Sequence, residues 1–319
     1  MARIYVCGEA LIDFVPGQDN AGNLTYQPKC GGSPFNAAKV AATTGGDVWF
    51  LGAISQDFFG DQLLQDLTSS GVKCDLAPRS DDPTTLAFVD MSLGTPRYAF
   101  YNNATATRNM QVPSGIINPM PGDILDVGSI SLIDKPGANN IAKFCSDMSG
   151  KILISVDPNV RPSMINDPRD WQHRMDQILS QASIIKVSDE DLEFMAPDLA
   201  PAQFAETMIN GGALLVLITY GEQGVVAYNK LHQVHVSAPT VTVSDTVGAG
   251  DALMGAMLST VSKLCAENNG TLGVLSENQL QEMLQFATAA AALNCTKVGA
   301  YPPTTDEIDN FQKSTRTST

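Results

Sequence analysis

The residues best suited to chemistry in this chain form a glycine-rich stretch that ends in an aspartate, Asp245-Thr246-Val247-Gly248-Ala249-Gly250-Asp251. An apolar, helix-forming run follows at 252–258, so we expect a loop that turns into a buried helix. The amides of Gly248, Ala249 and Gly250 would then be free at the helix N-terminus, where they and the helix dipole bind anions. A carboxylate such as that of Asp251 is repelled by an anion bound next to it, so its position there is explained if it takes a proton from a nucleophile that attacks the anion. A simple helix cap is the alternative role for Asp251.

The heptapeptide resembles the signature Asp-Thr-x-Gly-Ala-Gly-Asp of the ribokinase-like (PfkB) family of sugar and nucleoside kinases. The resemblance implies that Asp251 is the catalytic base and that the amides of Gly248, Ala249 and Gly250 form the anion hole. It also implies that Asp245 and Val247 supply oxygens to a monovalent cation such as K⁺. The other common phosphate loop, Gly-x-x-x-x-Gly-Lys-Ser/Thr, does not occur in the sequence.

A second glycine-rich stretch lies about 200 residues earlier, at Gly31-Gly32-Ser33-Pro34-Phe35-Asn36. It opens a predicted helix with Ser33 as the N-cap and Pro34 as the first helical residue. Together with a later Asp-x-Phe-Gly at 57–60, it resembles the N-terminal signature of the same family. The resemblance implies that Asp13, Gly31, Gly32 and Asn36 contact sugar hydroxyls. A carboxylate accepts such hydrogen bonds, and an amide both donates and accepts them.

Apolar runs alternate with helical patterns from residue 3 to about 220, which predicts a mainly parallel central sheet with helices on both faces. The predicted first strand spans 3–7, and Asp13 should lie just beyond it, at the sheet edge where ligands gather. We assign 1–13, 31–83 and 102–319 to this main domain, and 14–30 and 84–101 to a small β-sheet. In the family such a sheet is a lid over the sugar and often a homodimer surface; an ordinary edge hairpin is the alternative.

The resemblance also assigns residues to the nucleotide. Thr219, Gly221 and Gly224 match a Thr-x-Gly-x-x-Gly turn near the phosphates, and Ala287 and Ala291 lie on a predicted helix, 276–294, that borders the adenine. Lys186 is also assigned to this site. The family's Asn-x-x-Glu, which serves the magnesium and phosphate network, is replaced here by Ser188 and Asp191, so a water-mediated Mg²⁺ contact of Asp191 is easier than a direct one.

Charge and cysteine content limit the partners. The formal net charge of −15 disfavours nucleic acid and anionic membranes, and no apolar run is long enough to span a bilayer. The six cysteines form no Cys-x-x-Cys pair, and the N-terminus has no signal-peptide pattern, so we expect reduced thiols in a cytoplasmic protein.

The family's reaction is phosphoryl transfer from MgATP to a primary sugar hydroxyl. Ribokinases usually carry Lys within the motif that here reads Ser33-Pro34-Phe35, and the stretch 157–161, which ends in Arg161, resembles fructokinases and 2-keto-3-deoxygluconate kinases. The latter usually place an Arg after an aromatic pair in the lid, where Tyr101 is followed by Asn102-Asn103. We therefore expect a ketohexose, with fructose first and ketodeoxygluconate or ribose as alternatives. Arg161, Tyr101 and Asn103 are candidate sugar contacts, and Arg161 is also a candidate to hold the transferring phosphoryl group. A non-catalytic sugar- or nucleotide-binding regulator is the alternative of another class.

Overall fold

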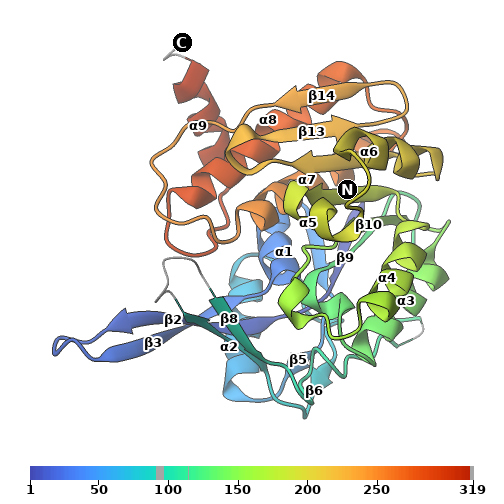
Figure 1. The fold of residues 1–319 in the computed structure, drawn as a ribbon. Helices are drawn as coiled ribbons and strands as arrows, with labels where there is room; N and C mark the ends of the chain where they lie inside the picture. Colours follow the sequence, from blue (N-terminus) through green and yellow to red (C-terminus); the bar gives the residue numbers. More distant parts are fainter. Residues whose placement is uncertain (91–96, 114, 317–319) are drawn as a thin grey trace.

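The computed structural model describes residues 1–90, 97–113 and 115–316 (Figure 1). Within them the main sheet has the strand order β14-β13-β12-β11-β10-β9-β1-β4. All neighbouring strands from β12 to β4 run parallel, and β13 and β14 are antiparallel, which confirms the predicted mainly parallel sheet. The strands are β1 (Arg3–Cys7), β4 (Asp47–Phe50), β9 (Ile124–Gly128), β10 (Leu153–Asp157), β11 (Ile184–Ser188), β12 (Leu215–Thr219), β13 (Val225–Tyr228) and β14 (Gln233–Val236).

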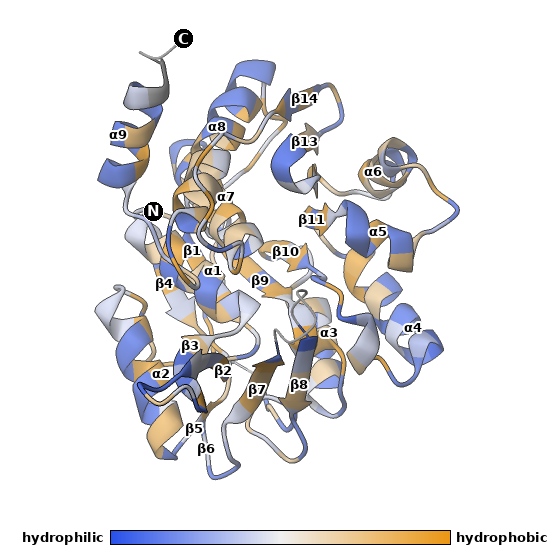
Figure 2. Ribbon diagram, turned by 60° about the vertical axis from the view of Figure 1, so that its left-hand side comes forward, coloured by the Kyte–Doolittle hydropathy of each residue, from blue (hydrophilic) through white to orange (hydrophobic). Residues whose placement is uncertain are grey.

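Helices cover both faces of this sheet, because alternate strand residues point to opposite sides. Ile4 and Val6 of β1 face one core, whereas Tyr5 and Cys7 face the other. Figure 2 shows that the strands are largely hydrophobic, while α4 and α9 expose hydrophilic residues. The first core is packed by α1 (Ser33–Thr43), α2 (Phe58–Ser69), α7 (Ala249–Glu267), α8 (Glu277–Cys295) and α9 (Thr305–Arg316); the second is packed by α3 (Gly137–Met148), α4 (Pro168–Leu179), α5 (Asp189–Met195) and α6 (Pro201–Asn210).

A separate sheet has the order β3-β2-β7-β8. It comprises β2 (Leu11–Gln18), β3 (Leu24–Gly31), β7 (Thr85–Asp90) and β8 (Arg97–Tyr101), and a short pair, β5 (Ile54–Ser55) and β6 (Arg79–Ser80), lies apart from it. The small sheet starts at Leu11 rather than at 14, so Asp13 lies inside β2 and not in a loop after β1. The predicted hairpin connection at 92–96 lies outside the described residues. The division into two domains remains a prediction.

Helices α1 and α7 cross very closely, and a glycine makes this contact possible. A Cβ atom on Gly255 of α7 would lie 2.4 Å from the Ala37 carbonyl oxygen and 2.7 Å from Val40 Cβ, both on α1. Only a residue without a Cβ fits there. The close crossing brings the first turns of α1 and α7 together, and these turns carry the two sequence signatures. Across residues 1–90, 97–113 and 115–316, none of the helices has the length and apolarity to cross a membrane.

Candidate active site

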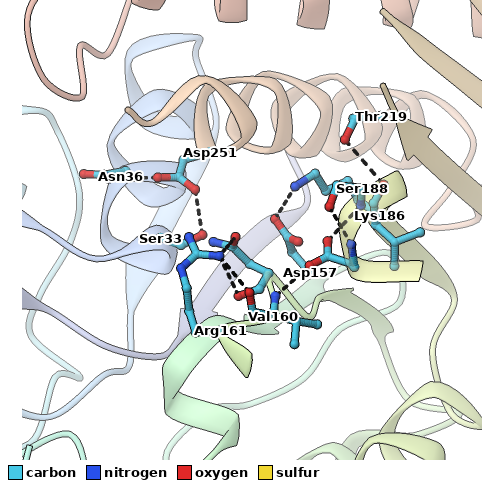
Figure 3. Close-up of polar contacts among 12 residues, drawn as sticks. Ser33, Asn36, Asp157, Val160, Arg161, Lys186, Ser188, Thr219 and Asp251 are labelled. Atoms are coloured by element: carbon cyan, nitrogen blue, oxygen red, sulfur yellow. Dashed lines mark hydrogen bonds and ion pairs between the residues drawn. The ribbon is translucent and has the colours of Figure 1, made fainter. Parts of the chain in front are cut away.

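The first turns of α1 and α7 meet at Asp251. Its side chain is buried, with Oδ1 accepting a hydrogen bond from Ser33 Oγ at 2.6 Å and Oδ2 accepting one from Asn36 Nδ2 at 2.8 Å (Figure 3). Burial raises the pKa of Asp251 above its ordinary value, and the bonds from Ser33 and Asn36 oppose that rise. A fixed, buried carboxylate with a raised pKa is suited to accept a proton. The predicted N-cap was wrong by one residue, since Gly32 is the N-cap and the Ser33 hydroxyl is left for Asp251.

The N-terminus of α7 differs from prediction in one amide. Gly248 is the N-cap, with the left-handed φ of 78° that favours glycine. The Ala249 N–H donates to the Thr246 carbonyl at 3.2 Å, so it is not free as predicted. In the described part of the chain, the N–H groups of Gly248, Gly250 and Asp251 have no acceptor. The anion-binding donors available at this end are therefore these three amides.

Asp13 lies on β2 beside the glycine pair that precedes α1. A Cβ on Gly31 would come within 2.2 Å of Asp13 Oδ2, so glycine is required for the carboxylate to sit there. Burial, followed by repulsion from Asp251, raises the pKa of Asp13 to about 6. No hydrogen-bond donor contacts this carboxylate within residues 1–90, 97–113 and 115–316, so its oxygens are available to a ligand.

The small sheet corrects one predicted sugar contact. Asp13 pairs with Ala87 and Ala87 pairs with Phe100, and paired residues share a face, so Phe100 lies on the Asp13 face. Tyr101 therefore points to the opposite face, where its ring lies 5.6 Å from that of Phe88 and 63% of the residue is exposed. Tyr98, which stacks on Phe100 at 5.8 Å, lies on the Asp13 face instead.

Tyr98 was not predicted as a site residue. Burial, with the charge of Asp13 adding to it, raises the pKa of Tyr98, so this phenol lies near the carboxylates of Asp13 and Asp251. Strand alternation was visible in the sequence, but the register that sets the inward face was not. Asn103, also predicted to contact sugar, accepts a hydrogen bond from Arg108 Nη1 at 2.8 Å, and its sugar role remains a prediction.

A buried ion pair lies directly below the α7 N-terminus. Lys186 Nζ is 2.8 Å from Asp157 Oδ2, and both side chains are almost fully buried (Figure 3). A Cβ on Gly250 would lie 3.2 Å from Lys186 Nζ. Lys186 is held under Gly250 by Asp157, where its charge attracts neighbouring anionic groups through space; its predicted contact with the nucleotide remains a prediction.

Arg161 follows β10 and is the second cation near Asp251. Its Nη1 donates to Asn159 Oδ1 at 2.8 Å and to the Val160 carbonyl at 3.0 Å, which fixes the guanidinium. Among the described residues, Nε and Nη2 have no acceptor, so the fork retains donors for a ligand oxygen.

The acidic start of α5 is a helix cap. Asp191 Oδ2 accepts from the Ser188 N–H at 2.8 Å, and the Asp191 N–H donates to Ser188 Oγ at 3.0 Å. Asp191 Oδ1 accepts from the Val160 N–H at 2.7 Å, and the residue is 5% exposed. Each oxygen already accepts a backbone N–H and the side chain is buried, which disfavours direct coordination of Mg²⁺ by Asp191; the predicted water-mediated contact remains a prediction. No group of three His, Cys, Asp or Glu side chains suited to a metal occurs in the described parts of the chain.

Several of the other predicted nucleotide residues lie at the carboxyl edge of the main sheet. Thr219 ends β12 and pairs with Ser188, so both lie at the carboxyl edge of the sheet. Gly221 has a φ of 53°, and a Cβ on Gly224 would be 2.1 Å from the Val236 carbonyl oxygen, so the turn requires glycine. Ala287 is fully buried in the core and cannot border an adenine in this structure, which corrects that assignment. Ala291 is partly exposed, and its role remains a prediction.

The loop before α7 is tied to the loop after α8. Asp245 Oδ2 accepts from the Gly299 N–H at 2.9 Å, and Asp245 Oδ1 accepts from the Val247 N–H at 3.0 Å. Asn294 bridges the loops, since its Nδ2 donates to the Val247 carbonyl at 2.8 Å and its Oδ1 accepts from the Tyr301 N–H at 2.7 Å. Carboxylate and carbonyl oxygens held in this way are a donor set that fits a hard cation.

Comparison with known proteins agrees with this geometry. The model of the "pfkB family carbohydrate kinase" matches residues 1–307. A fructokinase of Rhizobium leguminosarum bv. trifolii is 36% identical over 264 residues, which are 81% of this chain and 79% of the relative. The ATP-bound fructokinase structure from Xylella fastidiosa superimposes with a TM-score of 0.87 at 27% identity, covering 98% of this chain and 99% of the other. A fructokinase double mutant from Vibrio cholerae O395, bound to fructose, ADP and potassium, gives 0.85 at 25% identity, covering 98% of each chain.

Proposed function

Because the chain belongs to the pfkB family of carbohydrate kinases, we propose that it transfers the γ-phosphoryl group of ATP to a primary hydroxyl of fructose. The observation that carries the proposal is the buried Asp251, fixed by Ser33 and Asn36 beside the free amides of α7. A base and an anion hole on the same helical turn are the two groups that phosphoryl transfer to an alcohol requires.

The site residues divide into a sugar side and a phosphate side. Asp13 and Asn36 Oδ1, which accepts no hydrogen bond from any residue that the structure describes, accept sugar hydroxyl hydrogen bonds, and Asp251 accepts the proton of the attacking hydroxyl. General-base catalysis of this kind is worth roughly 10²- to 10⁴-fold in rate. The amides of Gly248, Gly250 and Asp251 bind the transferring phosphoryl oxygens, and each such donor contributes about 2.7–4 kcal/mol in other enzymes.

Cations support the charge on the phosphates. Mg²⁺ would be held chiefly by the ATP phosphates, since Asp191 is committed to backbone amides, and it neutralises charge on the β- and γ-oxygens. Asp245 and the Val247 carbonyl are proposed to hold K⁺ next to the N-terminus of α7. Arg161 is proposed to contact the sugar or the transferring group through its free Nε and Nη2.

Fructose is favoured over an acidic sugar. Arg108, the first cation after the small-sheet strand β8, donates to Asn103 Oδ1 at 2.8 Å and lies 3.5 Å from Asp134, so it already has partners within the protein. The relatives named above are fructokinases. Ketodeoxygluconate and ribose are the alternative sugars.

The test is ADP release with MgATP and a panel of fructose, ketodeoxygluconate, ribose and no sugar, for the wild type and Asp251→Asn. The variant should fold, because the Ser33 hydroxyl can accept a hydrogen bond from the new side-chain amide at position 251, and the Asn36 side-chain amide can flip to present its oxygen. We expect selective turnover with fructose and a loss of roughly 10²- to 10⁴-fold in the variant, with fructose binding retained. Normal turnover in Asp251→Asn would refute the role of Asp251 as the general base. Sugar binding without turnover in the wild type would favour a non-catalytic regulator.

We also propose a homodimer through the small sheet and a cytoplasmic location. The face of the sheet opposite Asp13 exposes Leu24, Tyr26 and Tyr101 at 66%, 40% and 63%. A second copy of the chain would cover this apolar face, and size-exclusion chromatography with light scattering on Leu24→Asp tests it. All six cysteines are free thiols, as a reducing compartment favours.

A further inference from the structure

Glu9 is a buried carboxylate that the proposed mechanism does not use. It follows β1 and is 1% exposed. Its Oε1 accepts a hydrogen bond from the Ser33 N–H at 3.3 Å, and its Oε2 accepts one from the Ser131 N–H at 3.2 Å. Ser33 is the first residue of α1, and Ser131 lies in the short helix η1 (Ser129–Leu132). One side chain thus joins the start of α1 to a turn that follows β9.

Helix α1 lacks a cap of its own. Its N-cap residue is Gly32, which has no side chain to accept from the first amides. Glu9 supplies that acceptor from another element, and its negative charge is also favourable at a helix N-terminus. Gly32 packs directly on Glu9, because a Cβ at Gly32 would lie 2.8 Å from the Glu9 carbonyl oxygen and 3.1 Å from Glu9 Cγ. The position of the first turn of α1 is therefore set by Glu9.

The same turn holds the base. Ser33 and Asn36 are the two residues that donate to the carboxylate of Asp251, at 2.6 and 2.8 Å. Any shift of the first turn of α1 moves both donors together. A contact chain therefore runs from Glu9 through Ser33 to Asp251.

We propose that Glu9 is a positioning residue for phosphoryl transfer, which fixes the first turn of α1 and, through Ser33, orients Asp251. The inference rests on the proposed role of Asp251 as the base. Burial raises the pKa of Glu9, and hydrogen bonds from the Ser129 hydroxyl and from the Ser131 and Ser33 amides partly offset that rise. The resulting pKa is about 7. The carboxylate form is the one that can accept from both amides.

Glu9→Gln tests the proposal with little change in shape. The amide keeps one acceptor oxygen but turns an NH₂ group toward the second backbone N–H, so one of the two bonds is lost. A misplacement of about 1 Å can cost 10²-fold in rate, so we expect kcat to fall by 10- to 10²-fold while the Kd for ATP stays within a factor of about 2. A kcat equal to that of the wild type would overturn the proposal.

Asp123→Asn is the matched control. Asp123 is also a buried carboxylate that accepts from two backbone amides, those of Arg3 at 2.8 Å and Met120 at 3.0 Å, but it precedes β9 at the opposite end of the sheet. We expect this variant to lower the melting temperature and leave kcat unchanged. If it lowered kcat as much as Glu9→Gln does, the effect of Glu9 would be general destabilisation and the proposal would fail.

A double-mutant cycle with Ser33→Ala tests the route. Ser33→Ala removes the Ser33 hydroxyl bond to Asp251 but keeps the Asn36 bond, so the fall in kcat caused by Glu9→Gln should be smaller, but not absent, in the Ser33→Ala background. Additive effects would refute the route. A failure of this proposal can be told apart from a failure of the proposed function. If Asp251→Asn loses turnover while Glu9→Gln keeps the wild-type kcat, only the role of Glu9 is refuted.

Discussion

Replacing Gly255 by alanine should impair the base without touching the site. The new Cβ would lie 2.4 Å from the Ala37 carbonyl oxygen and 2.9 Å from the Ala41 nitrogen, which are backbone atoms of α1 and cannot turn aside. Ordinary van der Waals contact requires α1 and α7 to separate by about 1 Å. The Asn36–Asp251 bond, now 2.8 Å, would then pass the roughly 3.5 Å limit of a hydrogen bond.

Two effects oppose each other in the stability of this variant. Overpacking costs about 1–3 kcal/mol, and alanine in place of glycine within a helix recovers about 1 kcal/mol. We therefore expect a loss of about 0–2 kcal/mol in the free energy of unfolding, measured in urea, but a fall of about 10²-fold in kcat from the misplaced base.

Gly211→Ala is the control for this experiment. Gly211 follows α6 with a helical φ of −75°, and a Cβ there would meet nothing closer than 3.3 Å. It should retain wild-type stability and kcat. If Gly255→Ala kept wild-type kcat, the reasoning that the close crossing of α1 and α7 positions Asp251 would be refuted.

Three further variants probe the surroundings of the site. Lys186→Met should lower the free energy of unfolding by about 3–5 kcal/mol in urea, because it leaves Asp157 buried and unpaired, and Asp157→Asn in the same chain should reduce that loss. Asn294→Ala removes the bonds of this side chain to the Val247 carbonyl and the Tyr301 N–H, so calorimetric titration should show weaker K⁺ binding, and unfolding in urea should show a loss of about 1–3 kcal/mol. Fructose affinity should fall as pH drops through about 6, because Asp13 then becomes protonated, and calorimetry on Asp13→Asn should show a flat profile. Because folding raises the pKa of Asp13, ionisation of this group lowers the free energy of unfolding as the pH rises from the ordinary pKa of an aspartate to about 6. Urea unfolding should therefore show that Asp13→Asn is more stable than the wild type above that pH.

The sequence was informative wherever local pattern decides structure. The predicted strand at 3–7 forms β1 with the predicted bounds, and its residues after Arg3 are buried in the two cores. The glycine-rich stretch before Asp251 does end as the first turn of a buried helix, α7. Periodicity and turn residues are local properties, so one sequence is sufficient to predict them.

Prediction failed where a residue's role depends on a distant partner. Tyr101 was predicted as a sugar contact and Tyr98 was not, because the register of β8 against β7 cannot be derived from either strand alone. Ser33 was expected to cap its own helix, yet its hydroxyl bonds Asp251, 218 positions away. Ala287 lies on a helix of small residues, but only packing shows that it faces the core.

A strongly acidic chain that handles ATP must overcome its own charge locally. The net charge is −15, and Asp13, Asp157 and Asp251 all lie near the site. The fold opposes this with the buried ammonium of Lys186 under Gly250 and with free amides that carry partial positive charge. Backbone amides supply these donors without adding a side chain to the site or a flexible cationic group that could form an ion pair with Asp251. This explains why the phosphate side is built from a glycine-rich helix start, while the Lys186 side chain lies beneath it, already paired with Asp157.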